Sequence, residues 1–361
     1  MAAASEELAV REQIRNRCSQ PWTLMEVCGG QTHALLRHGI DQLLPETITL
    51  IHGPGCPVCV TALERIDQAL AAAEQQEVIL CSYGDMLRVP GSNGRDLLSI
   101  RAQGGDVRVV YSPLDVLEIA QKEPQRQVVF FAVGFETTAP ATALLAQKAI
   151  TAGVNNLQLL VAHVRVAPVL DQLLADPACQ VQGVLAAGHV CTVMGEAEHR
   201  QLVARHRVPI VVTGFSAKAL LQGIDCCITQ LEAGEHRLEN AYTQAVAPEG
   251  NGHARQRIEA VFENCDTTWR GLGVVTGGGM RLRAPYNQLA YAGGSTAASR
   301  SAPLEVSADP CPSALVLQGL LKPSDCPSFA GRCTPEQPLG APMVSSEGAC
   351  AAYYRYSRRR V

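Results

Sequence analysis

Short apolar runs alternate with helix-like stretches along most of this sequence, and that alternation restricts the fold more than any other feature. A first series of runs covers residues 23–27, 48–51, 78–81 and 107–110, and a second series covers residues 128–133, 157–161, 183–186 and 210–213. Strands joined by helices pair in parallel. We therefore predict an α/β protein with two Rossmann-like lobes built on parallel sheets.

The predicted boundaries follow a polar stretch at residues 121–126. They place the first lobe in residues 1–125, the second in 126–245, and a helical or irregular region in 246–361. Residues 290–312 are rich in Ala, Gly, Ser and Pro, as linkers are. A chain of 361 residues exceeds the size of most single cores, which supports more than one domain.

Composition excludes some classes of function. Hydrophobic residues make up 47% and aromatic residues only 4%, which favours an aliphatic core between helices and parallel sheets. The net charge of −4, with both signs interspersed, gives no reason to expect nucleic-acid binding. The N-terminal segment lacks the apolar run of a signal peptide, and no later stretch is long enough for a membrane span. We therefore expect a cytoplasmic protein that does not bind membranes.

Four cysteines near the C-terminus form a candidate metal site. In a reducing compartment, clustered cysteines are metal ligands or redox groups more often than structural disulfides. Gaps of fourteen, six and sixteen residues separate Cys311, Cys326, Cys333 and Cys350. Four thiolates suit an iron–sulfur cluster or a tetrahedral zinc ion, but zinc ribbons usually pair ligands two to four residues apart. The spacing favours a cluster-binding C-terminal domain, and zinc remains the alternative.

A second pair of cysteines lies in the sequence GPGCPVC, residues 53–59. Two glycines and two prolines restrict this loop, and a C-x-x-C pair brings its sulfurs close enough to form a bridge or to bind a metal. We predict that Cys56 and Cys59 are a redox-active dithiol.

Cys28 follows another predicted strand and precedes a helix. The two glycines after it would hold its sulfur near the helix N-terminus, where the helix dipole stabilises a thiolate. His33 lies five residues further on and could act there as an acid, a base or a hydrogen-bond donor. The alternative for Cys28 is a small buried residue without chemistry.

Polar residues also follow other predicted strands. They are Glu136, Thr137, Thr138 and His189. Because ligands bind at the carboxyl ends of parallel strands, these residues are candidates to line a crevice between the lobes. Their alternative roles are helix capping and an ordinary surface histidine. None of the glycine turns matches a Walker A loop or a complete G-x-G-x-x-G, so the sequence does not favour nucleotide binding.

Several motifs together resemble one known family. They are MEVCGGQTHALLRHGI, IHGPGCPVCVT, VGFETTAP, PEGN, WRGLG and CTPEQPLGAPMVSSEGACAAYYRY. They extend from about residue 22 to residue 356 and are similar to the hydrogenase maturation factors of the HypD family. The resemblance implies two α/β domains, a 4Fe-4S cluster domain, and a complex with a HypC-type chaperone and a HypE-type cyanide donor. The Fe(CN)2CO group of the nickel–iron hydrogenase active site is put together on that scaffold.

The same resemblance assigns roles by position. It makes Cys311, Cys326, Cys333 and Cys350 the cluster ligands, Cys56 and Cys59 the redox dithiol, and Cys28 the iron-binding cysteine at the HypC contact. Glu347 lies in a matched motif near the cluster.

The sequence departs from many relatives at Ser313 and Pro342, where further cysteines are expected, and the four-cysteine spacing survives without them. The motifs around His163 and His189 also differ from the commoner forms, which leaves the roles of these histidines open.

These observations lead to a hypothesis. Electrons pass from the cluster to Cys56 and Cys59, while Cys28 holds a transient Fe(CN)2CO iron fragment and His33 tunes or protonates the site. This describes a redox-active assembly scaffold rather than a turnover enzyme, and we expect the free protein to be a monomer. The alternatives are a stand-alone iron–sulfur thiol–disulfide reductase and a structural zinc scaffold.

Overall fold

The chain folds around two parallel sheets, described here from a computed structural model for residues 2–293 and 311–357. The first sheet has the strand order β2–β1–β7–β8–β9. Its strands are β1 (Trp22–Glu26), β2 (Ile48–His52), β7 (Gly183–Ala187), β8 (Ile210–Thr213) and β9 (Leu238–Asn240). All of its neighbouring strands run parallel, so the α/β prediction is confirmed for this part.

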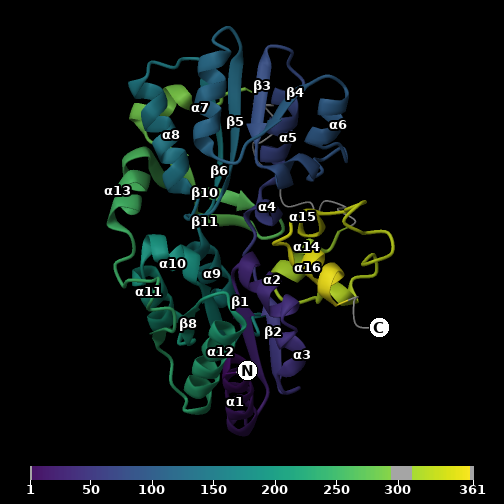
Figure 1. Cartoon of the computed structure of the whole chain (residues 1–361), viewed down its shortest axis with the longest axis vertical. Coiled ribbons are helices and arrows are strands. Elements are labelled where there is room, and N and C mark those ends of the chain that lie inside the picture. Colours follow the sequence, from purple (N-terminus) through teal and green to yellow (C-terminus); the bar gives the residue numbers. More distant parts are fainter. Residues whose placement is uncertain (1, 294–310, 358–361) are drawn as a thin grey trace.

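The second sheet is also parallel, with the order β4–β3–β5–β6. Its strands are β3 (Val78–Ser82), β4 (Asp106–Val109), β5 (Gln127–Gly134) and β6 (Leu157–His163). It fills the upper half of the molecule in Figure 1, and the first sheet fills the lower half. All residues of β3 and β7 are buried, as expected for strands that helices cover on both faces.

The two sheets do not follow the predicted boundary at residue 125. That boundary separates β3 and β4 from their sheet partners β5 and β6, whereas β1 pairs with β7. The second sheet is therefore inserted between β2 and β7 of the first. The division into lobes 1–125 and 126–245 was wrong in this respect, because pairing between distant strands leaves no mark in a local apolar pattern.

Helices cover both sheets. Those that precede the second sheet's last strand are α1 (Ala2–Arg17), α2 (Gly29–Arg37), α3 (Ile40–Leu43), α4 (Pro57–Val60), α5 (Leu63–Ala73), η1 (Gly84–Arg88), α6 (Leu97–Ala102), α7 (Pro113–Lys122) and α8 (Ala139–Thr151). Those that follow are α9 (Val166–Ala175), α10 (Gly188–Met194), α11 (Ala197–His206), α12 (Ala217–Glu232) and α13 (Gly252–Val261). Within the described residues, every helix is too short or too polar to cross a bilayer.

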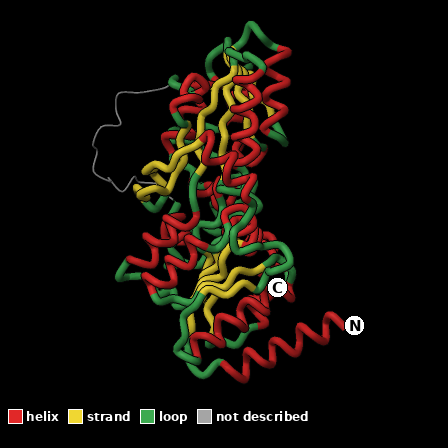
Figure 2. The backbone as a smooth tube through the Cα atoms, turned by 90° about the vertical axis from the view of Figure 1, so that its left-hand side faces the viewer, coloured by secondary structure: helices red, strands yellow, loops and turns green. Residues whose placement is uncertain are grey.

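An antiparallel hairpin was missed by the sequence analysis. Strands β10 (Phe262–Trp269) and β11 (Gly273–Leu282) pair in the region predicted to be helical or irregular, residues 246–361. In Figure 2 the hairpin stands out from the side of the tube, next to the second sheet. Polar residues in β10 and glycines in β11 interrupt the continuous apolar run that marks a buried strand.

The C-terminal segment packs on the side of the molecule where the two sheets meet (Figure 1). It contains α14 (Ser313–Leu317), η3 (Pro323–Asp325), α15 (Ala341–Val344) and α16 (Ala349–Tyr356). The preceding η2 (Ala284–Leu289) packs instead on β6 of the second sheet and on α8. Helix α16 packs on α2, and α15 packs on α4. Residues 294–310 of the predicted linker lie outside the described part of the chain.

Candidate functional site

Two of the predicted site loops meet backbone to backbone. Cys28 is the residue before α2, and the amide of Gly29 donates to the carbonyl of Gly55 over 2.8 Å. A Cβ atom at Gly55 would lie 2.5 Å from the Cα atom of Cys28, so only glycine fits there. This contact places the loop of Cys56 directly against the loop of Cys28.

A buried glutamate organises the Cys28 loop. Glu26 ends β1 and is fully buried. Its Oε2 accepts from the Cys28 amide over 2.8 Å, and its Oε1 accepts from the Thr32 hydroxyl and from His52 Nδ1, the latter over 2.8 Å. Three donors therefore satisfy both carboxylate oxygens, as a buried charge requires.

The Cys28 thiol is not activated by its helix. Burial, and after it the charge of Glu26, raise the pKa of Cys28 to about 12. Backbone amides at the start of α2 act in the opposite direction and do not outweigh these effects. The start of α2 therefore acts in the expected direction, but burial and Glu26 outweigh it. A cation bound at this sulfur would displace the proton, because metal ligands bind as thiolates.

Cys56 and Cys59 form a disulfide with a Cα–Cα distance of 5.2 Å. Cys56 caps the N-terminus of α4, and its sulfur accepts a hydrogen bond from the Cys59 amide over 3.2 Å. Both residues are buried, with 3% and 1% of their surface exposed. The predicted proximity of these two sulfurs is confirmed.

The four C-terminal cysteines line one apolar cavity. Cys311, Cys326, Cys333 and Cys350 come from four separate segments and share this cavity with Val316, Phe329, Leu339, Pro342 and Met343. No three His, Cys, Asp or Glu side chains in the described part of the chain are placed to hold a single metal ion. Four thiols around one cavity are the donor set of an iron–sulfur cluster, which binds a thiolate at each iron.

The cavity itself favours a bound cationic group. Burial, and after it the neighbouring thiols of Cys311, Cys333 and Cys326, raise the pKa of Cys350. Four thiolates in an apolar cavity repel one another unless a metal group compensates their charge. The donor set therefore fits an iron–sulfur cluster.

Two short helices connect this cavity to the other site loops. Pro342 and Met343 of α15 line the cavity, and α15 also packs against α4, which carries Cys59. Cys350 is on α16, which packs against α2 directly after Cys28. Figure 1 shows α2, α4, α15 and α16 gathered at the junction of the two sheets. All seven predicted cysteines therefore belong to one region.

His33 makes its contacts with the C-terminal segment. Its Nδ1 lies 3.4 Å from the Ser346 carbonyl, and its Nε2 lies 2.9 Å from the hydroxyl of Tyr356. Both ring nitrogens are thus occupied by α16 and the turn before it. The buried residue that does contact the Cys28 loop, Glu26, was missed; its signal was an acid at the end of an apolar run.

Glu347 also lies beside the Cys28 loop. A Cβ atom at Gly29 would lie 2.5 Å from the Glu347 Cβ, so the SSEGAC turn packs closely on the first turn of α2. Burial, and after it the charge of Asp85, raise the pKa of Glu347. This acid therefore lies near Cys28.

The other polar residues at strand ends do not share one crevice. Glu136 is fully buried and its Oε1 accepts from the Val166 amide over 3.0 Å, while Thr137 is exposed and Thr138 bonds the Phe135 carbonyl. Glu136 therefore does not line an open cleft, contrary to expectation.

His163 and His189, whose roles the sequence leaves open, lie in different surroundings. His163 is buried against Thr142, and burial lowers its pKa to about 4. The exposed ring of His189 stacks on Phe215 with centroids 3.8 Å apart. Phe215 in turn lies beside Gly30, next to Cys28.

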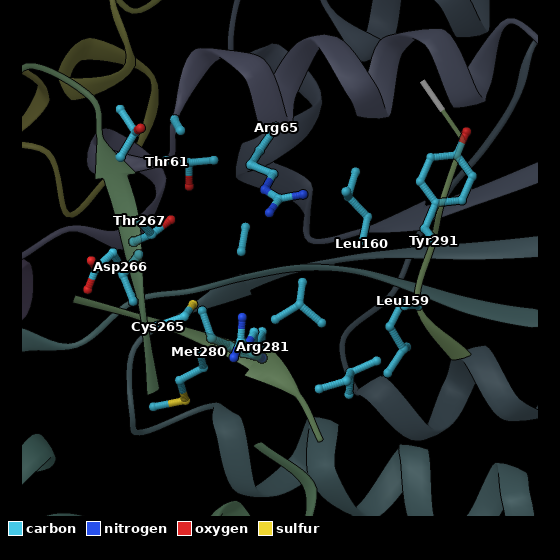
Figure 3. Close-up of a pocket in the computed structure, with 18 of the residues that line it drawn as sticks. Thr61, Arg65, Leu159, Leu160, Cys265, Asp266, Thr267, Met280, Arg281 and Tyr291 are labelled. Carbon is cyan, nitrogen blue, oxygen red and sulfur yellow. The ribbon is translucent and has the colours of Figure 1, made fainter. Parts of the chain in front are cut away.

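A separate cavity of about 290 Å³ lies between β6 and the β10–β11 hairpin. Figure 3 shows Arg65 extending toward its centre, with Arg281, Cys265 and Tyr291 around it. None of the seven predicted cysteines lines this cavity. It begins at Thr61, two residues after Cys59, so it adjoins the dithiol segment without exposing the disulfide.

Comparisons with known proteins agree with the motifs. Residues 5–357 match the family model HypD, described as "Hydrogenase formation hypA family". The chain is 43% identical over 366 residues to "Hydrogenase maturation factor HypD" of Escherichia coli (strain K12), covering 99% of this chain and 97% of that protein. It is 42% identical over 364 residues to "Hydrogenase expression/formation protein HupD" of Azotobacter chroococcum mcd 1, covering 99% and 95%. It is also 42% identical over 349 residues to "Hydrogenase maturation factor HypD" of Rhizobium leguminosarum bv. viciae, covering 95% and 90%. The chain therefore belongs to the HypD family of hydrogenase maturation factors.

Proposed function

We propose that this protein is an iron–sulfur scaffold on which the Fe(CN)2CO group of a nickel–iron hydrogenase active site is assembled. The observation that carries the proposal is the packing of α15. This helix lines the four-cysteine cavity on one side and packs on the Cys56–Cys59 segment on the other. The disulfide segment in turn touches the Cys28 loop through Gly55. The three cysteine sites thus form a continuous series.

Cys311, Cys326, Cys333 and Cys350 are the residues that would hold a 4Fe-4S cluster. When bound, such a cluster supplies single electrons. The apolar walls of the cavity keep water away from the thiolates and hold the four segments together. Metal–ligand bonds there replace part of the core that this short segment lacks.

Cys56 and Cys59 are the two-electron couple of the proposal. Their disulfide accepts two electrons and two protons, the S–S bond breaks, and two thiols form. The reverse step returns two electrons and two protons. Because both sulfurs are buried, this exchange proceeds within the protein and is protected from external thiols.

Cys28 is the proposed ligand for the iron cargo. Its thiol keeps its proton until a cation arrives, because burial and Glu26 raise its pKa to about 12. Soft thiolates suit iron that carries strong-field ligands such as cyanide and CO. We propose that a HypC-type chaperone completes this site and that a HypE-type protein delivers cyanide. The hydrogen bonds of His33 to the C-terminal segment support an orienting role rather than a direct proton transfer.

The stand-alone reductase is less well supported by the same geometry. A reductase that acts on a protein disulfide needs an attacking sulfur at the surface. Cys56 and Cys59 have 3% and 1% of their surface exposed. A structural zinc scaffold is also less well supported, because the gaps between the four cysteines are wider than those of zinc ribbons.

The test is anaerobic co-purification of the protein with its candidate partners from cells that mature a nickel–iron hydrogenase. We expect brown protein with iron and sulfide, and infrared bands from cyanide and CO. The Cys56→Ser variant should keep the cluster absorption, but it cannot form the disulfide. We expect the yield of matured hydrogenase to fall by roughly tenfold or more, which corresponds to about 1.4 kcal/mol or more in a rate-limiting barrier. Cys18→Ser, which changes a cysteine whose thiol hydrogen-bonds Gln20 and Thr47, is the matched control.

Normal hydrogenase yield with Cys56→Ser would refute the dithiol role. A protein without diatomic bands that reduces a protein disulfide by itself would instead identify a reductase. Zinc without iron or sulfide would identify the structural scaffold.

A further inference from the structure

One face of α16 joins the four-cysteine cavity to both histidines near Cys28. Cys350, Tyr353 and Tyr356 are spaced three residues apart, so they follow one side of the helix. Cys350 lines the cavity. The Tyr353 hydroxyl lies 3.2 Å from His52 Nε2, and the Tyr356 hydroxyl lies 2.9 Å from His33 Nε2. The helix that carries a cavity thiol therefore also carries two tyrosine–histidine pairs.

The first pair continues to the Cys28 backbone. His52 Nδ1 donates to Glu26 Oε1 over 2.8 Å, which leaves Nε2 to accept from the Tyr353 hydroxyl. Glu26 Oε2 accepts from the Cys28 amide over 2.8 Å. Tyr353, His52 and Glu26 are 8%, 4% and 0% exposed. A chain of hydrogen bonds shielded from water thus runs from α16 to Cys28.

The second pair reaches α2 from the other end. His33 Nδ1 donates to the Ser346 carbonyl over 3.4 Å, so the ring is held between the turn before α16 and Tyr356 at its last turn. The rings of His33 and Tyr356 meet edge to face with centroids 5.0 Å apart. Since α2 begins directly after Cys28, this pair fixes the helix against which the Cys28 loop is built.

We propose that α16 positions the Cys28 loop through the Tyr353–His52–Glu26 chain and the Tyr356–His33 pair, so that fixing Cys350 in the cavity also fixes Cys28. Tyr353, Tyr356 and His52 are thus positioning residues. The inference rests on the proposed function, because it takes the cavity as a cluster site. Filling the cavity ties Cys350 to cysteines on three other segments, and α16 transmits that constraint because buried, fully satisfied networks are rigid.

This coupling implies an order of assembly. Loading the cavity would come first, and the iron-binding loop would reach its final geometry only afterwards. Coupling between two sites is reciprocal, so holding the Cys28 loop would also favour a filled cavity. A protein without its cluster would therefore present a loosened cargo site.

Hydrogen exchange followed by mass spectrometry tests this coupling. The full-length protein is compared after anaerobic loading with iron and sulfide and after treatment with a chelator. In the wild type, we expect loading to slow exchange in peptides covering residues 22–37 about fivefold, the factor that corresponds to one hydrogen bond of about 1 kcal/mol. In Tyr353→Phe this slowing should fall below about twofold, while the iron and sulfide content and the visible absorption stay unchanged.

Tyr354→Phe is the matched control. It also removes a hydroxyl from α16, but its ring packs on Phe329 rather than on a histidine, and it should keep the wild-type slowing. Tyr356→Phe removes the hydroxyl that contacts His33 and provides a second variant if Tyr353→Phe does not load. Equal exchange in loaded and chelated wild type would overturn the coupling. An undiminished slowing in both tyrosine variants would overturn it as well. Failure of the wild type to bind any iron or sulfide would instead refute the proposed function.

Discussion

Each of the two parallel sheets has a buried glutamate at the carboxyl end of one strand, and the two side chains differ in their hydrogen-bond partners. Glu26, at the end of β1, has donors on both carboxylate oxygens: the Cys28 amide, the Thr32 hydroxyl and His52. Glu136, just after β5, has the Val166 amide on Oε1 and no hydrogen-bond partner for Oε2 among the described residues. Both are fully buried.

The difference indicates that Glu26 holds neighbouring groups in place, whereas Glu136 is a group that can take up a proton. A carboxylate with a donor on each oxygen holds its neighbours in place. A buried carboxyl group with a free oxygen favours its neutral form, and burial raises the pKa of Glu136 to about 7 despite the nearby charge of Arg165. The first sheet thus fixes the Cys28 loop, whereas the second sheet carries an acid that titrates near neutrality.

The largest effect should come from removing the organising glutamate. Glu26→Ala leaves the Cys28 amide, Thr32 and His52 without their acceptor, so the free energy of unfolding should fall by about 4 kcal/mol. Urea unfolding of the full-length protein measures it. Glu64→Ala, an exposed acid on α5, is the control and should change stability by less than about 0.5 kcal/mol. Equal losses of stability in Glu26→Ala and Glu64→Ala would show that Glu26 does not organise the Cys28 loop.

A pH dependence should identify the other glutamate. Between pH 4.5 and 7 the unfolded chain loses the Glu136 proton while the folded protein keeps it, so rising pH lowers stability in this window. The raised pKa corresponds to about 3 kcal/mol, lost by about pH 8. Unfolding is measured for the wild type and for Glu136→Gln at pH 5 and pH 8. Buried His163 titrates in the opposite sense in both proteins, so the prediction concerns their difference: the stability of the wild type relative to Glu136→Gln should fall by about 2 to 3 kcal/mol between the two pH values. Parallel pH profiles would show that Glu136 does not titrate in the folded protein.

The smallest of the three effects should come from the contact between the site loops. Gly55→Ala places a methyl group against the Cys28 backbone, which cannot move without breaking its bond to Glu26. We expect a loss of about 2 kcal/mol in the free energy of unfolding. Gly252→Ala, where a Cβ meets nothing within 4 Å, should be neutral. A neutral Gly55→Ala would show that the two loops are not packed as described.

Much of the fold could be predicted because buried parallel strands are continuous apolar runs. Eight strands lie where the sequence places them, to within two residues at any end. The assignment of strands to sheets failed because β1 and β7 pair across residues 53–182, and no local pattern reports such a pairing. The hairpin β10–β11 was not predicted because its strands carry Glu263, Asp266 and a run of glycines.

The cysteines of the candidate site could be predicted, but the residues that hold the cysteine loops in place could not. A motif of glycine, proline and cysteine at short spacing can be read from one segment alone, as in residues 53–59. The partners of the site lie far apart in sequence: His52 meets Tyr353, and Gly29 meets Glu347. Glu26 had one weak signal, an acid at the end of an apolar run, and only the structure shows that it faces inward.

The insertion of the second sheet sets the time at which the site can exist. During synthesis β1 and β2 leave the ribosome first, but their sheet cannot be completed until β7 and β8 follow. The second sheet is continuous in sequence and can fold in that interval, since domains form as units and long-range pairings form late. The Cys28 loop then still lacks α16, the last described helix of the chain. A nascent chain therefore holds the Cys28 loop without the helix that packs on α2, and the iron site proposed above would form only after α16 has left the ribosome.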